Sequence, residues 1–73
     1  SGLSLLHIHH NKPGVLTQIN QMFAKHNINI AAQYLQTADQ IGYVVIDIEV
    51  ESRELALKEL KQIEATIRVR LLN

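Results

Sequence analysis

Residues 3–23 read LSLLHIHHNKPGVLTQINQMF, and the spacing of the apolar residues changes halfway along this stretch. From Leu3 to His10 the side chains alternate, which is typical of a half-buried strand. One side of this strand would carry Leu6 and Ile8, and the other Leu5, His7 and His9. The following Asn11-Lys12-Pro13-Gly14 interrupts the alternation, and proline has no amide to lose at the first helical position. The sequence therefore predicts a strand over 3–10 and a helix beginning at Pro13.

Beyond this junction, apolar residues recur at spacings of three and four and define one face of the helix. The stripe consists of Val15, Leu16, Ile19, Met22 and Phe23. Lys25-His26-Asn27 ends the pattern, because Asn tolerates the left-handed conformation and basic side chains suit the negative end of the dipole. Further along, alternation predicts strands over about 28–36, 43–50 and 66–72 and a hairpin turn over 38–42. Between the last two strands we expect a helix capped by Ser52 and ending near Glu64.

The order β-α-β-β-α-β is the split unit of the ferredoxin-like fold, an α+β sandwich. Its four-stranded antiparallel sheet carries both helices on one face. Right-handed crossovers place the first and third strands in the centre and the second and fourth at the edges. We expect one domain over residues 3–73, preceded by Ser1-Gly2 as a remnant of cloning.

The composition narrows the classes of function. Seven Lys and Arg residues balance seven Asp and Glu residues, and residues 26–52 include no Lys or Arg. A basic patch that binds nucleic acid or an anionic membrane cannot form there. The longest uncharged stretch, residues 26–38, is too short and too polar to span a bilayer. Since the chain also lacks Cys and a signal-peptide pattern, we expect a cytoplasmic location.

Three kinds of chemistry find few suitable residues. Base recognition needs aromatic side chains on the open sheet face, where the third strand offers Tyr43 beside acidic residues. His7 and His9 would share one face and His10 would point away, so solvated histidines at a strand end are a simpler interpretation than a metal site. No nucleophile lies beside a base held by a third group. We therefore assign no catalytic residue and no metal ligand, and expect the fragment not to be an enzyme.

A small ligand could bind where the first strand meets the first helix. The first amides of a helix lack internal acceptors and lie at the positive end of its dipole, so Gly14 and its successors could hold a carboxylate. His9 and Asn11 have the same strand parity and would point the same way, offering donors and acceptors. The alternative is that Asn11 only shapes the turn and that Pro13-Gly14 is ordinary loop sequence.

The second strand is an unprotected edge, because residues 27–38 contain no charge, Pro or Gly. On the opposite edge strand, the charges of Arg68 and Arg70 disfavour pairing with another chain. We therefore expect the second strand to pair with its own copy across a two-fold axis, giving a homodimer with an eight-stranded sheet. Cover by another domain of a longer chain is the alternative. Asn29 would lie near the helix entrance of the neighbouring chain or of its own.

Three segments together resemble a known family: HIHHNKPGVL at 7–16, NINIAAQYLQT at 27–37 and GYVVID at 42–47. They are similar to the C-terminal ACT domains of bacterial D-3-phosphoglycerate dehydrogenases, NAD-dependent enzymes that open L-serine synthesis. The resemblance extends from about Leu5 to Leu72. The Asn-x-Pro-Gly-Val-Leu segment alone marks the wider ACT family, and its combination with the second segment is highly specific. His10, Lys12 and Asn27 stand where relatives often have acidic, Arg and Gly residues.

The resemblance implies an allosteric regulatory domain that binds L-serine at the seam between two ACT domains and gives feedback inhibition. By position, His9 and Asn11 of one chain and Asn29 of the other would contact serine, with Gly14 and Val15 at the helix entrance. The implied partners are L-serine as effector, a second copy, and the catalytic domains of the parent chain, which would hold the NAD. The fragment itself would bind no cofactor. The alternatives are a structural dimerisation module without ligand sensing and a metal-responsive module that uses the histidines.

Overall fold

The chain follows the β-α-β-β-α-β order in a computed structural model that describes residues 2–72. The elements are β1 (Gly2–His10), α1 (Val15–Lys25), β2 (Ile30–Ala38), β3 (Ile41–Glu49), the 3-10 turn η1 (Val50–Ser52), α2 (Arg53–Lys61) and β4 (Thr66–Leu71). Gly2, half of the expected cloning remnant, is the first residue of β1. Ser1, the other half, and Asn73, the end of the expected domain, lie outside the described residues.

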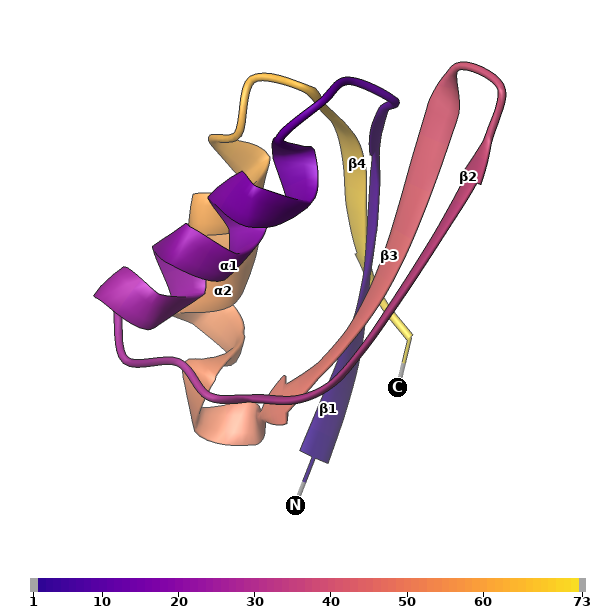
Figure 1. Ribbon diagram of the computed structural model, residues 1–73. Helices are drawn as coiled ribbons and strands as arrows, with labels where there is room; N and C mark the ends of the chain where they lie inside the picture. Colours follow the sequence, from indigo (N-terminus) through magenta and orange to yellow (C-terminus); the bar gives the residue numbers. More distant parts are fainter. Residues whose placement is uncertain (1, 73) are drawn as a thin grey trace.

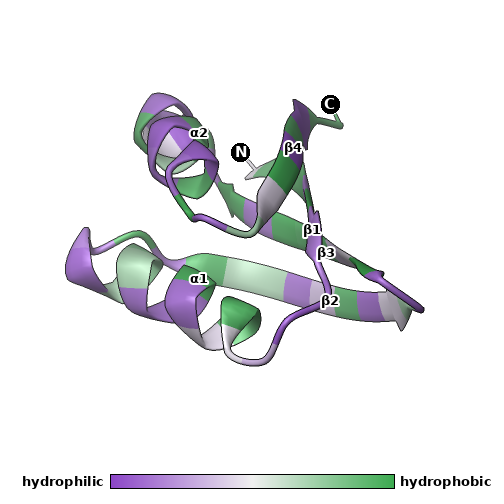
Figure 2. Cartoon of the chain, turned by 90° about the horizontal axis from the view of Figure 1, so that it is seen from above, coloured by the Kyte–Doolittle hydropathy of each residue, from purple (hydrophilic) through white to green (hydrophobic). Residues whose placement is uncertain are grey.

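The four strands form one antiparallel sheet in the order β2-β3-β1-β4. Both helices lie on the same side of this sheet, and β2 runs along its outer edge (Figures 1 and 2). The ferredoxin-like sandwich and the placement of centre and edge strands are therefore confirmed.

The hydrophobic core lies between the sheet and the two helices. Its buried residues in regular elements are Leu3, Leu5, Val44, Ile46, Ile48, Val15, Ile19, Phe23, Ala56 and Leu60. They come from the inward faces of the two central strands and from the apolar stripes of the helices, as the spacing predicts. Each fully buried Leu, Ile or Phe contributes roughly 1.5–3 kcal/mol.

The first helix begins at Val15, so the prediction of a start at Pro13 is wrong. Gly14 occupies the N-cap position with φ 89°, a left-handed conformation that a right-handed helix cannot include. Pro13 consequently belongs to the turn before the helix. At the other end, Asn27 has φ 58°, which confirms the expected left-handed termination.

Several boundaries differ from the predicted ones by a few residues. The amide of Ile28 donates to the Phe23 carbonyl over 2.8 Å, so this residue closes the helix and β2 starts only at Ile30. The hairpin turn is shorter than expected, because only Asp39 and Gln40 separate β2 from β3. The second helix ends at Lys61, before Glu64. Ser52 holds its N-cap position but makes no side-chain capping bond, since η1 leads directly into α2.

Two of the three histidines of β1 are buried, so the interpretation of this cluster as solvated histidines is wrong for His7 and His9. His7 and His9 share the inward face with Leu5 and are 0% and 2% exposed, whereas His10 is exposed. The alternation expected in β4 also fails at one point. The register with β1 shifts between Ile8 and His9, and Ile67 is left 45% exposed. This irregularity turns Thr66 toward the buried histidines.

Candidate ligand-binding site

Four of the five predicted ligand-binding residues gather at one end of the sheet, where β1 leads into α1. Backbone hydrogen bonds hold this junction from two sides. The amide of His10 donates to the Ala65 carbonyl, and that of Asn11 to the Gln40 carbonyl, both over 2.8 Å. The loop that carries Asn11 and Gly14 and leads to Val15, the first residue of α1, is therefore fixed between the β2–β3 turn and the start of β4.

Asn11 does shape the turn, as its alternative interpretation proposed. Its Nδ2 donates to the backbone carbonyl of Asp39 over 3.0 Å and so links the β1–α1 loop to the hairpin. One of the two Nδ2 hydrogens is thereby occupied, and Oδ1 is the acceptor that an exposed Asn can offer to a ligand.

The imidazole of His9 fills the space beside a glycine. His9 and Gly42 are paired across β1 and β3, and a Cβ placed on Gly42 would lie 2.3 Å from His9 Nε2. The His9 ring also stacks on His7, with 5.3 Å between ring centroids and 27° between planes. Burial, and secondly the charge of His10, lower the pKa of His9 from 6.5. His9 is therefore a neutral ring at pH 7.

The α1 N-terminus opens next to these side chains. The first helical hydrogen bond runs from the Gln18 amide to the Gly14 carbonyl, so the amides of residues 15–17 have no acceptor within the helix. The first turn contains no acidic residue that would compete for them. This end of α1 carries partial positive charge and is suited to a carboxylate.

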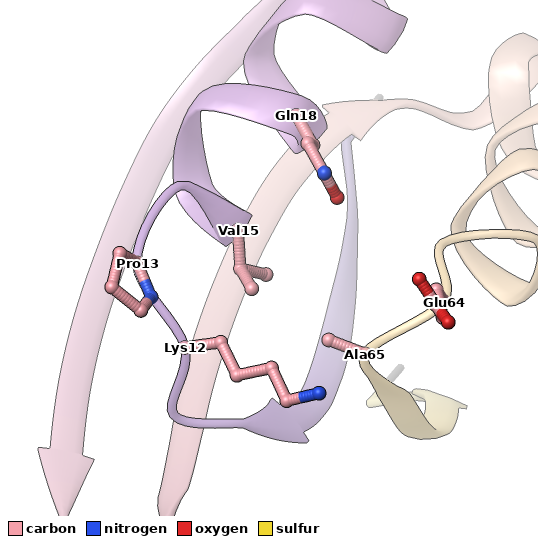
Figure 3. A pocket seen from close by; sticks show the side chains of 6 residues that line it. All are labelled: Lys12, Pro13, Val15, Gln18, Glu64 and Ala65. Carbon is pink, nitrogen blue, oxygen red and sulfur yellow. The ribbon is translucent and has the colours of Figure 1, made fainter.

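A pocket of about 90 Å³ lies between the start of α1 and the turn before β4. Its lining consists of Lys12, Pro13, Val15, Gln18, Glu64 and Ala65. Figure 3 shows Lys12 extending from the β1–α1 loop toward Ala65, with Glu64 on the far wall. Of the five predicted ligand-binding residues only Val15 lines this pocket. His9 and Asn11 are absent from its lining.

Asn29 lies at the opposite end of the sheet from the other predicted site residues. Asn29 directly precedes Ile30, the first residue of β2. Ile30 is paired with Ile48 on β3, and Ile48 is paired with Leu3 near the start of β1. Six residues along β1 separate Leu3 from His9, or about 20 Å of extended chain. A single copy of the chain therefore does not bring Asn29 to His9 and Asn11.

The sequence did not single out Gly42, His7 as a buried group, or Thr66. Gly42 did carry a signal, because an isolated glycine inside a strand pattern often marks a close approach by another group. Thr66 carried none, since its contact with His7 joins residues 59 positions apart in the chain.

Two other functional classes find no supporting feature in residues 2–72. No three His, Cys, Asp or Glu side chains in this range come together as a group that could hold a metal ion. None of the helices within the same range is long and apolar enough to cross a membrane.

Comparison with known proteins adds to this geometry. The chain is 59% identical, over 73 aligned residues, to D-3-phosphoglycerate dehydrogenase of Escherichia coli strain K12, and 56% identical over 68 residues to that of Haemophilus influenzae. These matches cover 97% and 93% of this chain but only 18% and 17% of the relatives. The chain thus spans less than a fifth of the length of these relatives.

Solved structures agree on the fold. The acetolactate synthase small subunit from Thermotoga maritima superposes with a TM-score of 0.85 at 20% identity, over 97% of this chain and 47% of that one. The model of the family described as "AHAS small subunit-like ACT domain" matches residues 5–68, which is most of the chain. The β-α-β-β-α-β fold agrees with this match, and the chain belongs to the ACT domain family.

Proposed function

We propose that this ACT domain binds L-serine in a site shared by two copies of the chain, and that this binding regulates a D-3-phosphoglycerate dehydrogenase of which it is one part. The observation that supports a shared site most strongly is the distance between Asn29 and the pair His9 and Asn11. A ligand that contacts all three needs a second copy.

The free edge of β2 is suited to supply that copy. Residues 31–38 are all exposed, and no element of the described chain lies beside them on the outer side. Leu35 points to the same face as the buried Val44 yet remains 40% exposed, because α1 does not cover it. A strand of nine residues whose outer edge is unpaired, and which carries an exposed Leu, favours pairing with another strand.

Two-fold pairing of β2 reverses one strand against the other. In an antiparallel pair, two residues that lie directly opposite each other point to the same face of the sheet. The two-fold axis must therefore pass between one residue of β2 and the same residue of the second copy. With Tyr34, the middle residue of β2, at the axis, the start of β2 in the partner subunit lies toward the β2–β3 turn, which brings Asn29 of the partner subunit toward Asp39. Asn11 donates to the carbonyl of Asp39, so this pairing would bring Asn29 of the partner subunit toward Asn11.

The groups assembled in this way match a free amino acid. The unpaired amides of α1 favour the carboxylate, and amide oxygens of Asn side chains accept from the ammonium or hydroxyl. The neutral His9 ring contributes an uncharged nitrogen, so it does not repel the ammonium. Gly14 and Val15 form the wall of the helix entrance.

Regulation requires that serine bind one arrangement of two ACT domains better than another. Typical coupling free energies of this kind are about 1–3 kcal/mol. In the parent enzyme, the interface between two ACT domains with L-serine bound would restrain the movement of the catalytic domains. L-serine, as the end product, would thereby slow its own synthesis.

Calorimetric titration with L-serine tests the proposal, with D-serine and glycine as controls, together with sedimentation at each ligand concentration. We expect saturable heat with L-serine, weaker binding of the controls and a dimer stabilised by the ligand. A dimer that is indifferent to all three amino acids would instead identify a dimerisation module without sensing.

A further inference from the structure

His7 is the most deeply buried titratable group of the chain's described residues, and the proposed ligand contacts leave it unused. Its side chain is 0% exposed in the core beside Leu5. One ring nitrogen, Nε2, lies 2.7 Å from the Thr66 hydroxyl oxygen. A polar ring in this position costs free energy unless its nitrogens are satisfied, so its presence in the core needs a structural explanation.

The hydrogen bonds around His7 fix its tautomer. The Thr66 hydroxyl donates its single hydrogen to the Leu60 carbonyl over 2.7 Å, near the end of α2. The hydroxyl oxygen can then only accept from His7, so His7 carries its hydrogen on Nε2. His7 Nδ1 is left bare, and neither it nor His9 Nδ1 has a hydrogen-bond partner among the described residues.

The groups that surround His7 include residues of β1, β3, β4 and the end of α2. Across the sheet, His7 is paired with Val44 on β3 and with Val69 on β4. The Thr66 hydroxyl lies beside Nε2 of His7, and this hydroxyl donates to the Leu60 carbonyl. Of these neighbours only His9, stacked on it along β1, is titratable. Burial lowers the pKa of His7 to about 4, with a further lowering by His9, so two neutral rings are stacked at pH 7.

We propose that His7 is a positioning residue: anchored by Thr66, its ring holds the His9 imidazole beside Gly42 in the orientation that the ligand meets. This inference rests on the proposed function for the role of His9, but the hold of His7 on His9 is a property of the unliganded chain. The contact of His9 with both Gly42 and His7 leaves its ring little freedom, which pre-organises the site and reduces the ordering cost of binding.

The decisive variant is Thr66→Val, which removes the acceptor of His7 with little change of volume. Thr66→Ser is the matched control, because it keeps the hydroxyl. The readouts are the imidazole nitrogen resonances of His7 and His9 in the unliganded chain and the affinity for L-serine. We expect Thr66→Val to move the His9 resonances and to weaken L-serine binding about tenfold, the equivalent of one lost buried hydrogen bond. Thr66→Ser should retain both wild-type properties.

A folded Thr66→Val chain with wild-type His9 resonances and wild-type affinity would overturn the inference. If Thr66→Val fails to fold, His7→Phe takes its place, because it keeps a ring that can stack on His9 but loses the hydrogen bond to Thr66. The His9 resonances and the affinity for L-serine of this variant then decide in the same way. If the wild-type chain binds no L-serine, the proposed function fails on its own. The His9 resonances still decide whether His7 positions that ring.

Discussion

His9 and Gly42 face each other across β1 and β3, and the imidazole occupies the place where any side chain on Gly42 would begin. A methyl group there would lie 2.3 Å from His9 Nε2, which no real contact tolerates. The ring cannot yield cheaply, because it is buried and stacked on His7. The position of the His9 ring on β1 therefore depends on the absence of a side chain at Gly42 on β3.

Gly42→Ala should consequently destabilise the chain and displace His9. Overpacking of a buried site costs about 1–3 kcal/mol in the free energy of unfolding, and we expect L-serine binding to weaken as well. Urea unfolding and calorimetry measure the two effects. Gly2→Ala is the control, since its Cβ would meet only the Ile48 carbonyl at 3.8 Å. Equal stability of the two variants would contradict the packing described for His9.

The stability of the chain should depend on pH through His7. An unfolded histidine binds a proton near 6.5 and the buried His7 only near 4, so between these values the unfolded state binds more protons. Stability is therefore complete above pH 6.5 and falls as the pH drops through this window, by up to about 3 kcal/mol. Urea titrations from pH 7 to acid measure the slope. The slope should flatten in His7→Phe, and an unchanged slope would show that His7 is not its source.

The affinity for L-serine should follow the protonation of His9. Burial lowers the pKa of His9, so we expect the affinity to decline at a lower pH than protonation of an ordinary histidine would produce. His10→Gln removes the charge that contributes to this lowering, so the decline should begin at higher pH. Calorimetry from neutral to acid pH compares the two chains. A profile that is flat into the acid range, or identical in His10→Gln, would speak against a neutral His9 at the ligand.

Pairing of two copies should depend on the β2 edge alone. Leu35→Lys places a charge on the exposed inward face of β2, a device by which natural edge strands prevent association. We expect this variant to sediment as a monomer. Ile67→Lys, on the opposite edge strand β4 and similarly exposed, should remain dimeric. A dimeric Leu35→Lys or a monomeric Ile67→Lys would place the interface elsewhere.

The arrangement of the elements could be predicted because each change of apolar period marks a change of secondary structure. Boundaries were less predictable, since the start of α1 depends on the left-handed Gly14 rather than on Pro13. Burial of His7 and His9 could not be predicted from an alternating strand, because a distant partner, Thr66, and the cover of α2 make it possible. The position of Asn29 relative to His9 likewise follows only from the register of the whole sheet.

Mixing two variants that each bind L-serine weakly tests the shared site most directly. Asn11→Ala and Asn29→Ala should each bind L-serine more weakly by about 1–3 kcal/mol per lost buried hydrogen bond. In a mixed dimer, Asn11 of one chain and Asn29 of the partner subunit are both intact at one of the two sites. After subunit exchange we predict wild-type affinity at about one site for every four chains, the statistical share for a two-fold dimer. No recovery of binding in the mixture, or full binding by Asn29→Ala alone, would contradict a site built from two copies.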